Sequence, residues 1–133
     1  MPTVDEAAGR PSERGSAPVE FVLVGLLLTV LFLALLQLGL DLHIRNVLIA
    51  SASEGARYGA TADRVPDDGA EHTRALIRGA LSDRFATDVR ASVADVDGTA
   101  IVVVTVRAPL PLVALLGPAQ TLVASGHALR EGP

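Results

Sequence analysis

The chain has 133 residues, which allows one small domain beside a hydrophobic segment but not a large enzyme. Eleven basic and 15 acidic residues give a formal net charge of −4, which argues against a nucleic-acid partner held through its phosphates. The chain contains no cysteine, so disulfides, thiolate metal sites and cysteine nucleophiles are excluded.

The first predicted element is an apolar helix from Phe21 to Leu40. Within it only Thr29 and Gln37 have polar side chains. At about 1.5 Å per residue the helix spans roughly 30 Å, which is the thickness of the hydrocarbon core of a bilayer. A cleaved secretory signal has a shorter apolar stretch followed by small residues at its cleavage site, and this segment has neither. We therefore predict a retained transmembrane helix that lies in the lipid bilayer.

The apolar helix is predicted to continue beyond the membrane as a stalk that ends near residue 62. Between Asp41 and Ala62 there is no proline, and apolar residues recur at steps of three and four. Ser51, Gly55 and Gly59 form a stripe of small residues at four-residue intervals. Such a stripe allows a second helix to approach closely, and that helix could belong to another subunit or to the C-terminal domain of the same chain.

An amphipathic helix is predicted after a polar break from Asp63 to Gly69. Asp68 and Glu71 have the spacing of a capping box, with Asp68 as the N-cap. The helix is therefore expected over residues 69–86. Its predicted apolar face consists of Leu76, Ile77, Ala80, Leu81 and Phe85.

A three-stranded sheet is predicted to follow this helix. Residues 89–93 alternate between apolar and polar, and Asp97-Gly98 is a strong hairpin signal. The β-branched run 101–106 indicates the central strand, and residues 121–129 indicate the third. The predicted fold class is α+β: a single N-terminal transmembrane helix extending into a stalk, one amphipathic helix and a small antiparallel sheet. This arrangement is broadly similar to a minimal pilin.

The apolar segment Leu112–Leu116 lies between the second and third predicted strands. It is too short to span a bilayer. A buried loop, a segment that touches the membrane surface and a patch for a partner are all compatible with its sequence.

No group of residues has the pattern of a catalytic or metal site. The histidines are far apart in sequence, and the serines have no nucleophile-elbow context. A weak metal site is conceivable where acidic residues and a histidine cluster, but helix capping explains those acids better. We therefore predict a protein that is not an enzyme and that has no metal, cofactor or small-molecule substrate. The clustered residues are Asp67, Asp68, Glu71 and His72.

The segment in front of the apolar run, from Gly15 to Phe21, resembles the prepilin peptidase site of type IV pilins and pseudopilins. The resemblance implies cleavage after Gly15, with Ser16 as the new N-terminus and Glu20 as the fifth mature residue. A carboxylate that enters the apolar zone is costly unless it is paired, and a free amino terminus supplies a cation. Alternatively, Glu20 marks the membrane interface without any processing.

A second motif follows the apolar run and reads Ser-Glu-Gly-Ala-Arg-Tyr-Gly from Ser53 to Gly59. Together with the first motif, it resembles TadE-like proteins of the bacterial tight-adherence (Tad/Flp) pilus system over residues 14–60. The chain departs from the family pattern because its apolar run has no proline, and Gly39-Leu40-Asp41 replaces an acidic-aromatic pair. The residues of the motif and of helix packing are Asn46, Ser51, Glu54, Gly55, Ala56, Arg57 and Gly59.

The resemblance implies a pilin-like single-pass membrane protein that acts in Tad/Flp pilus assembly or secretion. Its partners would be other pilin-like subunits, pilus assembly proteins and a prepilin peptidase. It would lie in the cell membrane with a cytoplasmic N-terminus and an extracytoplasmic C-terminal domain, although arginines flank the apolar run on both sides and do not decide the orientation. The expected divisions are a leader (1–15), a transmembrane and stalk helix (16–62) and a small α+β domain (63–133). The alternative is a generic membrane-anchored extracytoplasmic binding domain that is not processed.

Overall fold

The computed structural model describes residues 15–110 and 121–132. Most of the predicted leader and the Leu112–Leu116 segment therefore lie outside the described residues. The chain divides into two compact units, residues 1–37 and residues 38–133. The described elements are a long helix, a shorter helix, a 3-10 turn and a three-stranded antiparallel sheet, which confirms the α+β prediction.

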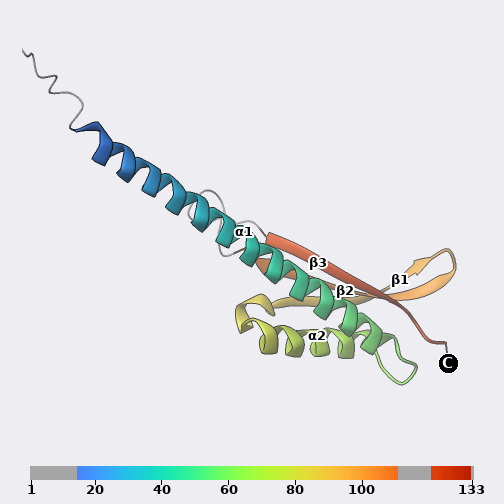
Figure 1. The fold of residues 1–133 in the computed structure, drawn as a ribbon. Coiled ribbons are helices and arrows are strands. Elements are labelled where there is room, and N and C mark those ends of the chain that lie inside the picture. Colours follow the sequence, from blue (N-terminus) through green and yellow to red (C-terminus); the bar gives the residue numbers. More distant parts are fainter. Residues whose placement is uncertain (1–14, 111–120, 133) are drawn as a thin grey trace, which may run out of the picture. The chain divides into compact units, whose positions relative to one another are not determined.

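Helix α1 runs from Ser16 to Ala60 (Figure 1). Pro18 lies in its first turn, where the missing backbone N–H leaves no helical hydrogen bond unmade. Residues 21–36 are exposed, and the helix is long and apolar enough to cross a membrane. The hydroxyl of Thr29 donates to the carbonyl of Gly25 at 2.8 Å, so this polar group is satisfied within the helix. The predicted apolar helix is confirmed as a candidate membrane span.

Helix α2 begins at Pro66, before the predicted start at residue 69, and ends at Ala80. Val65 is the N-cap, and proline fits the first helical position because its φ is already helical. The prediction that Asp68 is the N-cap was wrong. Asp68 lies in the first turn, where its carboxylate accepts a hydrogen bond from the N–H of Val65 at 3.1 Å. Asp68 therefore makes one of the two hydrogen bonds of a capping box, and this box lies three residues earlier in the chain than predicted.

The predicted last turn of this helix is a separate 3-10 turn, η1, from Asp83 to Phe85. Ser82 has extended backbone angles, and this interrupts the helical hydrogen bonds. Phe85 is buried as predicted, but Ala80 is exposed, so the apolar face of the predicted helix is only partly correct.

Strand β1 (Asp88–Val96) pairs with β2 (Thr99–Pro109), and β2 pairs with β3 (Thr121–Leu129), in the order β1-β2-β3. Asp97 and Gly98 connect β1 to β2 with φ angles of 53° and 80°. Two successive residues in the left-handed region are typical of the type I′ hairpin turn that an Asp-Gly pair favours. The hairpin, the central strand and the third strand are confirmed.

The core lies between one face of the sheet and the two helices, all within residues 38–133 (Figure 1). Val102, Val104 and Val106 of β2 are fully buried, as are Leu48 of α1 and Ile77 of α2. Each such side chain contributes about 1.5–3 kcal/mol when it is buried. The C-terminal half of α1 therefore supplies part of the core that holds the sheet.

Candidate functional site

The small-residue stripe of α1 lies against α2 of the same chain. Ser51, Gly55 and Gly59 are buried. A Cβ added at Gly55 would overlap the Thr73 hydroxyl and lie 2.6 Å from the carbonyl oxygen of Gly69. A Cβ added at Gly59 would lie 3.2 Å from the backbone of Gly69. The stripe thus allows close approach of two helices within one chain, which was one of the two alternatives that the sequence allowed.

Thr73 is the buried polar group at this helix contact, and it is fully excluded from solvent. Its Oγ1 lies 2.8 Å from the carbonyl oxygen of Gly69 and 3.3 Å from that of Ser51. The single hydroxyl proton is shared between these two carbonyl oxygens, so the buried hydroxyl is not left without a partner. The hydrogen bond to Ser51 also joins α2 directly to α1.

Gly126 of β3 lies directly beneath α1. A Cβ at this position would overlap the backbone of Ala52 and Ser53. The helix can therefore rest on the strand only because residue 126 has no side chain. The strand pattern predicted β3 but carried no sign of this contact, because a glycine within a strand is equally compatible with a bulge.

Tyr58, the aromatic residue of the second motif, takes part in a stack at the end of α1. Its ring lies parallel to that of His72, with centroids 4.2 Å apart and an interplanar angle of 8°. The guanidinium carbon of Arg64 lies 3.7 Å from the centre of the Tyr58 ring, which is a cation–π geometry. The stack connects α1, the loop after it and α2.

The charged residues of the second motif are exposed. The Glu54 carboxylate and the Arg57 guanidinium are 3.9 Å apart, and their side chains are 54% and 71% exposed, so this ion pair is weak. They border an open groove between α1 and α2 that is lined in part by Val47 and Leu76. Asn46 is also exposed, whereas Ala56 is buried in the core. Core packing therefore accounts for the small residues of the motif but not for its charged residues.

Asp68, Glu71 and His72, near the start of α2, have structural partners. Asp68 accepts the hydrogen bond from Val65, and Glu71 lies 2.8 Å from the guanidinium of Arg74. His72 stacks on Tyr58 as described above. Among the residues that the structure describes, no cluster of ligands could hold a metal ion.

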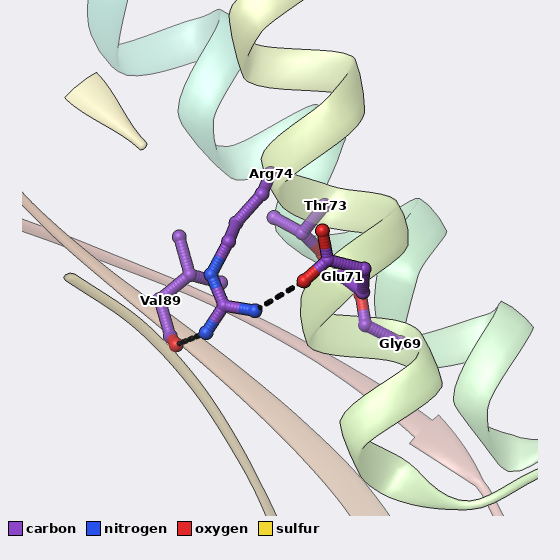
Figure 2. A network of polar contacts seen from close by, with 5 residues as sticks. All are labelled: Gly69, Glu71, Thr73, Arg74 and Val89. Carbon is purple, nitrogen blue, oxygen red and sulfur yellow. Dashed lines mark hydrogen bonds and ion pairs between the residues drawn. The ribbon is translucent and has the colours of Figure 1, made fainter. Parts of the chain in front are cut away.

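Arg74 joins α2 to the first strand, and sequence analysis did not identify this role. One of its nitrogens donates to Glu71, and the other donates to the carbonyl oxygen of Val89 at 2.7 Å (Figure 2). Gly69 and Thr73 were also missed as partners of the stripe. Their four-residue spacing on α2 is a signal that could have found them, because it is the same as the spacing on α1.

The residues of the predicted processing site lie at the start of α1. Gly15 is an exposed turn residue, Ser16 is the first helical residue, and Glu20 is exposed on the first turns. They belong to the unit of residues 1–37. Cleavage after Gly15 stays a prediction.

Comparison with known families finds that residues 15–57 match the family described as TadE-like protein. The match begins at Gly15 and ends at Arg57, so it includes the first motif and the second motif as far as Arg57, and it confirms the predicted resemblance. A TadE-like segment suggests involvement in the Tad pilus system. No curated protein and no solved structure matches the chain significantly.

Proposed function

We propose, from the TadE-like match over residues 15–57, that this protein is a pilin-like, single-pass membrane subunit of Tad/Flp pilus assembly or secretion. It acts by assembly and not by catalysis. A prepilin peptidase removes the leader after Gly15. The single observation that carries the proposal is that the family match contains the peptidase-like motif, the apolar helix and the second motif as far as Arg57 in one continuous segment.

The start of α1 supports the processing step. Gly15 is an exposed turn residue directly before the first helical residue, Ser16, so the proposed cleavage site lies at the boundary of α1 and not inside it. Cleavage there leaves the apolar helix with the mature protein. The new amino group of Ser16 then supplies a cation near the membrane interface, where the carboxylate of Glu20 or of a neighbouring subunit can pair with it.

The helix and the folded domain have separate tasks in this proposal. The apolar half of α1 packs against other pilin-like helices in the cell membrane, and Glu20 sets their register by charge pairing. The domain that begins at residue 38 faces the extracytoplasmic side and contacts assembly partners. The exposed pair Glu54 and Arg57 is a suitable contact, because the fold itself makes little use of it.

The processing step is tested by the intact mass of the protein from two matched strains, one with and one without the prepilin peptidase. We expect the mature chain to begin at Ser16 only in the strain with the enzyme, and Gly15→Leu to remain uncleaved there. Gly25→Ala is the matched control, because a Cβ at Gly25 also meets nothing within 4 Å and this glycine lies outside the motif. An unprocessed wild-type chain beside an active peptidase would refute the processing step.

A second measurement separates the pilin-like subunit from the alternative, a generic membrane-anchored binding domain. Glu20→Gln keeps the size of the side chain but removes its charge, and we expect it to abolish co-purification with other pilin-like subunits. Glu71→Gln, at another exposed carboxylate, is the control and should leave association unchanged. If Glu20→Gln associates normally and the leader is intact, the generic binding domain is the better description.

A further inference from the structure

The sheet has two edges, β1 and β3, and the hydrogen bonds show which backbone groups each edge presents. The N–H of Arg130 donates to the carbonyl oxygen of Ala100, which continues the register that pairs Leu129 with Ile101. In an antiparallel pair such bonded positions alternate with non-bonded ones. The even-numbered residues of β3 therefore bond to β2, and the odd-numbered residues direct their N–H and C=O groups away from the sheet. The outward residues are Thr121, Val123, Ser125, His127 and Leu129.

The next outward position supports this assignment. The N–H of Glu131 donates to the carbonyl oxygen of Ala60, at the end of α1, and not to a strand. Among the hydrogen bonds that the described residues make, no other bond joins the outward groups of β3 to another segment. Within residues 15–110 and 121–132, the row of alternating donors and acceptors from residue 121 to residue 129 therefore has no backbone partner.

The β1 edge differs, because side chains protect it. By the same alternation Val89 is an outward residue of β1, and its carbonyl oxygen accepts the hydrogen bond from Arg74 (Figure 2). Asp88 and Arg90 add an ion pair along the strand at 3.1 Å. Caps and charges of this kind are how proteins protect sheet edges from pairing. β3 contains no charged residue and no proline, so it lacks both kinds of protection.

The position of α1 limits what can pair with the β3 edge. The backbone of α1 rests on Gly126, in the middle of the strand. A helix is about 10 Å wide and neighbouring strands are about 4.8 Å apart, so α1 extends over the space beside β3. A second folded copy paired antiparallel through its own β3 would bring its α1 onto the same face, within about 5 Å of the first, whereas packed helices need about 8–10 Å. A single extended strand with no helix on this face avoids that clash.

We propose that the outer edge of β3 is an acceptor site for one extended, uncharged segment of a partner protein, which adds a fourth strand to the sheet. The backbone of the segment pairs with the outward groups of residues 121–129. On one face of the added strand its side chains meet Ile49, which is 41% exposed and lies three turns before Ala60 on the same side of α1. On the other face they meet the exposed side chains of Val123, Ser125, His127 and Leu129, of which Val123 and Leu129 are apolar and 54% and 69% exposed. The apolar contacts with Ile49, Val123 and Leu129 favour uncharged side chains at the positions that face them.

The acceptor site is tested with the full chain in detergent micelles and the acetylated, amidated peptide TLVASGHAL as the probe strand. This peptide has the sequence of β3 and contains no acidic residue, lysine or arginine. It can pair as a strand, and it has no covering helix. Amide hydrogen exchange is measured residue by residue. At saturating peptide we expect the amides of Val123, Ser125 and His127 to exchange at least tenfold more slowly. The outward amides of Ala91 and Val93 on the β1 edge should not change.

Two matched controls distinguish backbone pairing from apolar adhesion. A peptide with the same side chains but N-methyl groups on alternate residues cannot pair and should give no protection. Ser125→Pro removes one outward N–H of β3 without removing a bond to β2, and it should weaken peptide binding at least tenfold. Val93→Pro makes the same change on the β1 edge and should bind normally.

Three results would overturn the proposal. The first is unchanged exchange of the β3 amides up to roughly 5 mM peptide, where even a weak complex forms. The second is equal protection by the N-methylated peptide. The third is loss of binding in Val93→Pro, which would place the peptide on the other edge. If Ser125→Pro fails to fold, the comparison of the two peptides on the wild-type chain still decides the question.

Discussion

Gly55 is the position where a single added methyl group tests the contact between α1 and α2 most directly. In Gly55→Ala the new Cβ would overlap the hydroxyl of Thr73 and lie 2.6 Å from the carbonyl oxygen of Gly69. The Thr73 side chain can rotate away, but the Gly69 carbonyl belongs to the backbone of α2 and cannot. The two helices must therefore separate, and the side chains packed beneath them lose contact.

The expected size of the effect follows from three contributions to the free energy of unfolding. Replacing a helical glycine by alanine favours the folded state by about 1 kcal/mol. Inserting a methyl group into a close-packed contact costs about 1–3 kcal/mol, and the upper value applies where backbone must move. Displacing Thr73 from its buried hydrogen bonds costs about 1 kcal/mol more. We expect a net destabilisation of about 2–3 kcal/mol, or roughly 10–20 °C in Tm for a domain of this size.

The assay is equilibrium unfolding in urea, with the full chain in detergent micelles. Tyr58 is the only tyrosine, and the chain has no tryptophan. Because Tyr58 stacks on His72 at the contact between the two helices, intrinsic tyrosine fluorescence reports on the region that the substitution disturbs. The midpoint should fall at an unchanged slope if the denatured state is unaffected.

Gly79→Ala is the matched control, because Gly79 is also in a helix but a Cβ there meets nothing within 4 Å. Helical preference should then act alone and raise stability by about 0.5–1 kcal/mol. In the Gly55→Ala background, Thr73→Ala should destabilise the domain less than it does in the wild-type chain. The reason is that removing the Thr73 hydroxyl also removes its clash with the new Cβ. If Gly55→Ala is as stable as Gly79→Ala, the close helix contact is not the constraint inferred here.

Three further substitutions are predicted from the same packing. Gly126→Val should destabilise the domain by at least about 3 kcal/mol, measured by urea unfolding, because α1 backbone occupies the space of its side chain. Arg74→Met should cost about 0.5–1.5 kcal/mol in the same assay, because it removes the hydrogen bond to Val89 while keeping an apolar stem. Glu54→Gln should change stability by less than about 0.5 kcal/mol, because its pair with Arg57 is exposed and long.

Each of these predictions has an outcome that contradicts it. A wild-type midpoint for Gly126→Val would mean that α1 does not rest on β3. An effect of Glu71→Gln as large as that of Arg74→Met would assign the stabilisation to the exposed ion pair and not to the strand carbonyl. A large loss of stability in Glu54→Gln would give this residue a structural role that its exposure does not suggest.

Local patterns predicted the elements of this fold well. The hairpin at Asp97-Gly98 and the first strand, Asp88–Val96, follow from turn chemistry and two-residue alternation, which depend only on neighbouring residues. The start of α2 was predicted three residues late, because Asp68 was assigned as the N-cap although it lies in the first turn. Pro66 was the missed signal, since proline is favoured at the first helical position.

Only some residues of the candidate site were predicted from the sequence. The two motifs were visible because they are continuous in sequence, and the family match covers the first and most of the second. The arginine that caps the carbonyl of Val89 and the glycine that lies beneath α1 gave no usable signal. Their roles depend on segments that are distant in the chain, and a pattern of neighbouring residues carries no information about such contacts.

By itself the sequence determined a membrane-length apolar helix, an α+β domain and a TadE-like segment. These are properties of length, period and continuous motifs. Only the tertiary structure decided that the stripe Ser51, Gly55 and Gly59 faces α2 of the same chain, since two different partners satisfy the same spacing. It also decided that the β1 edge has a capped carbonyl at Val89, whereas β3 pairs on its outer side with no other strand of the described residues. That difference depends on hydrogen-bond register and on a helix resting on a strand, and both exist only once the chain has folded.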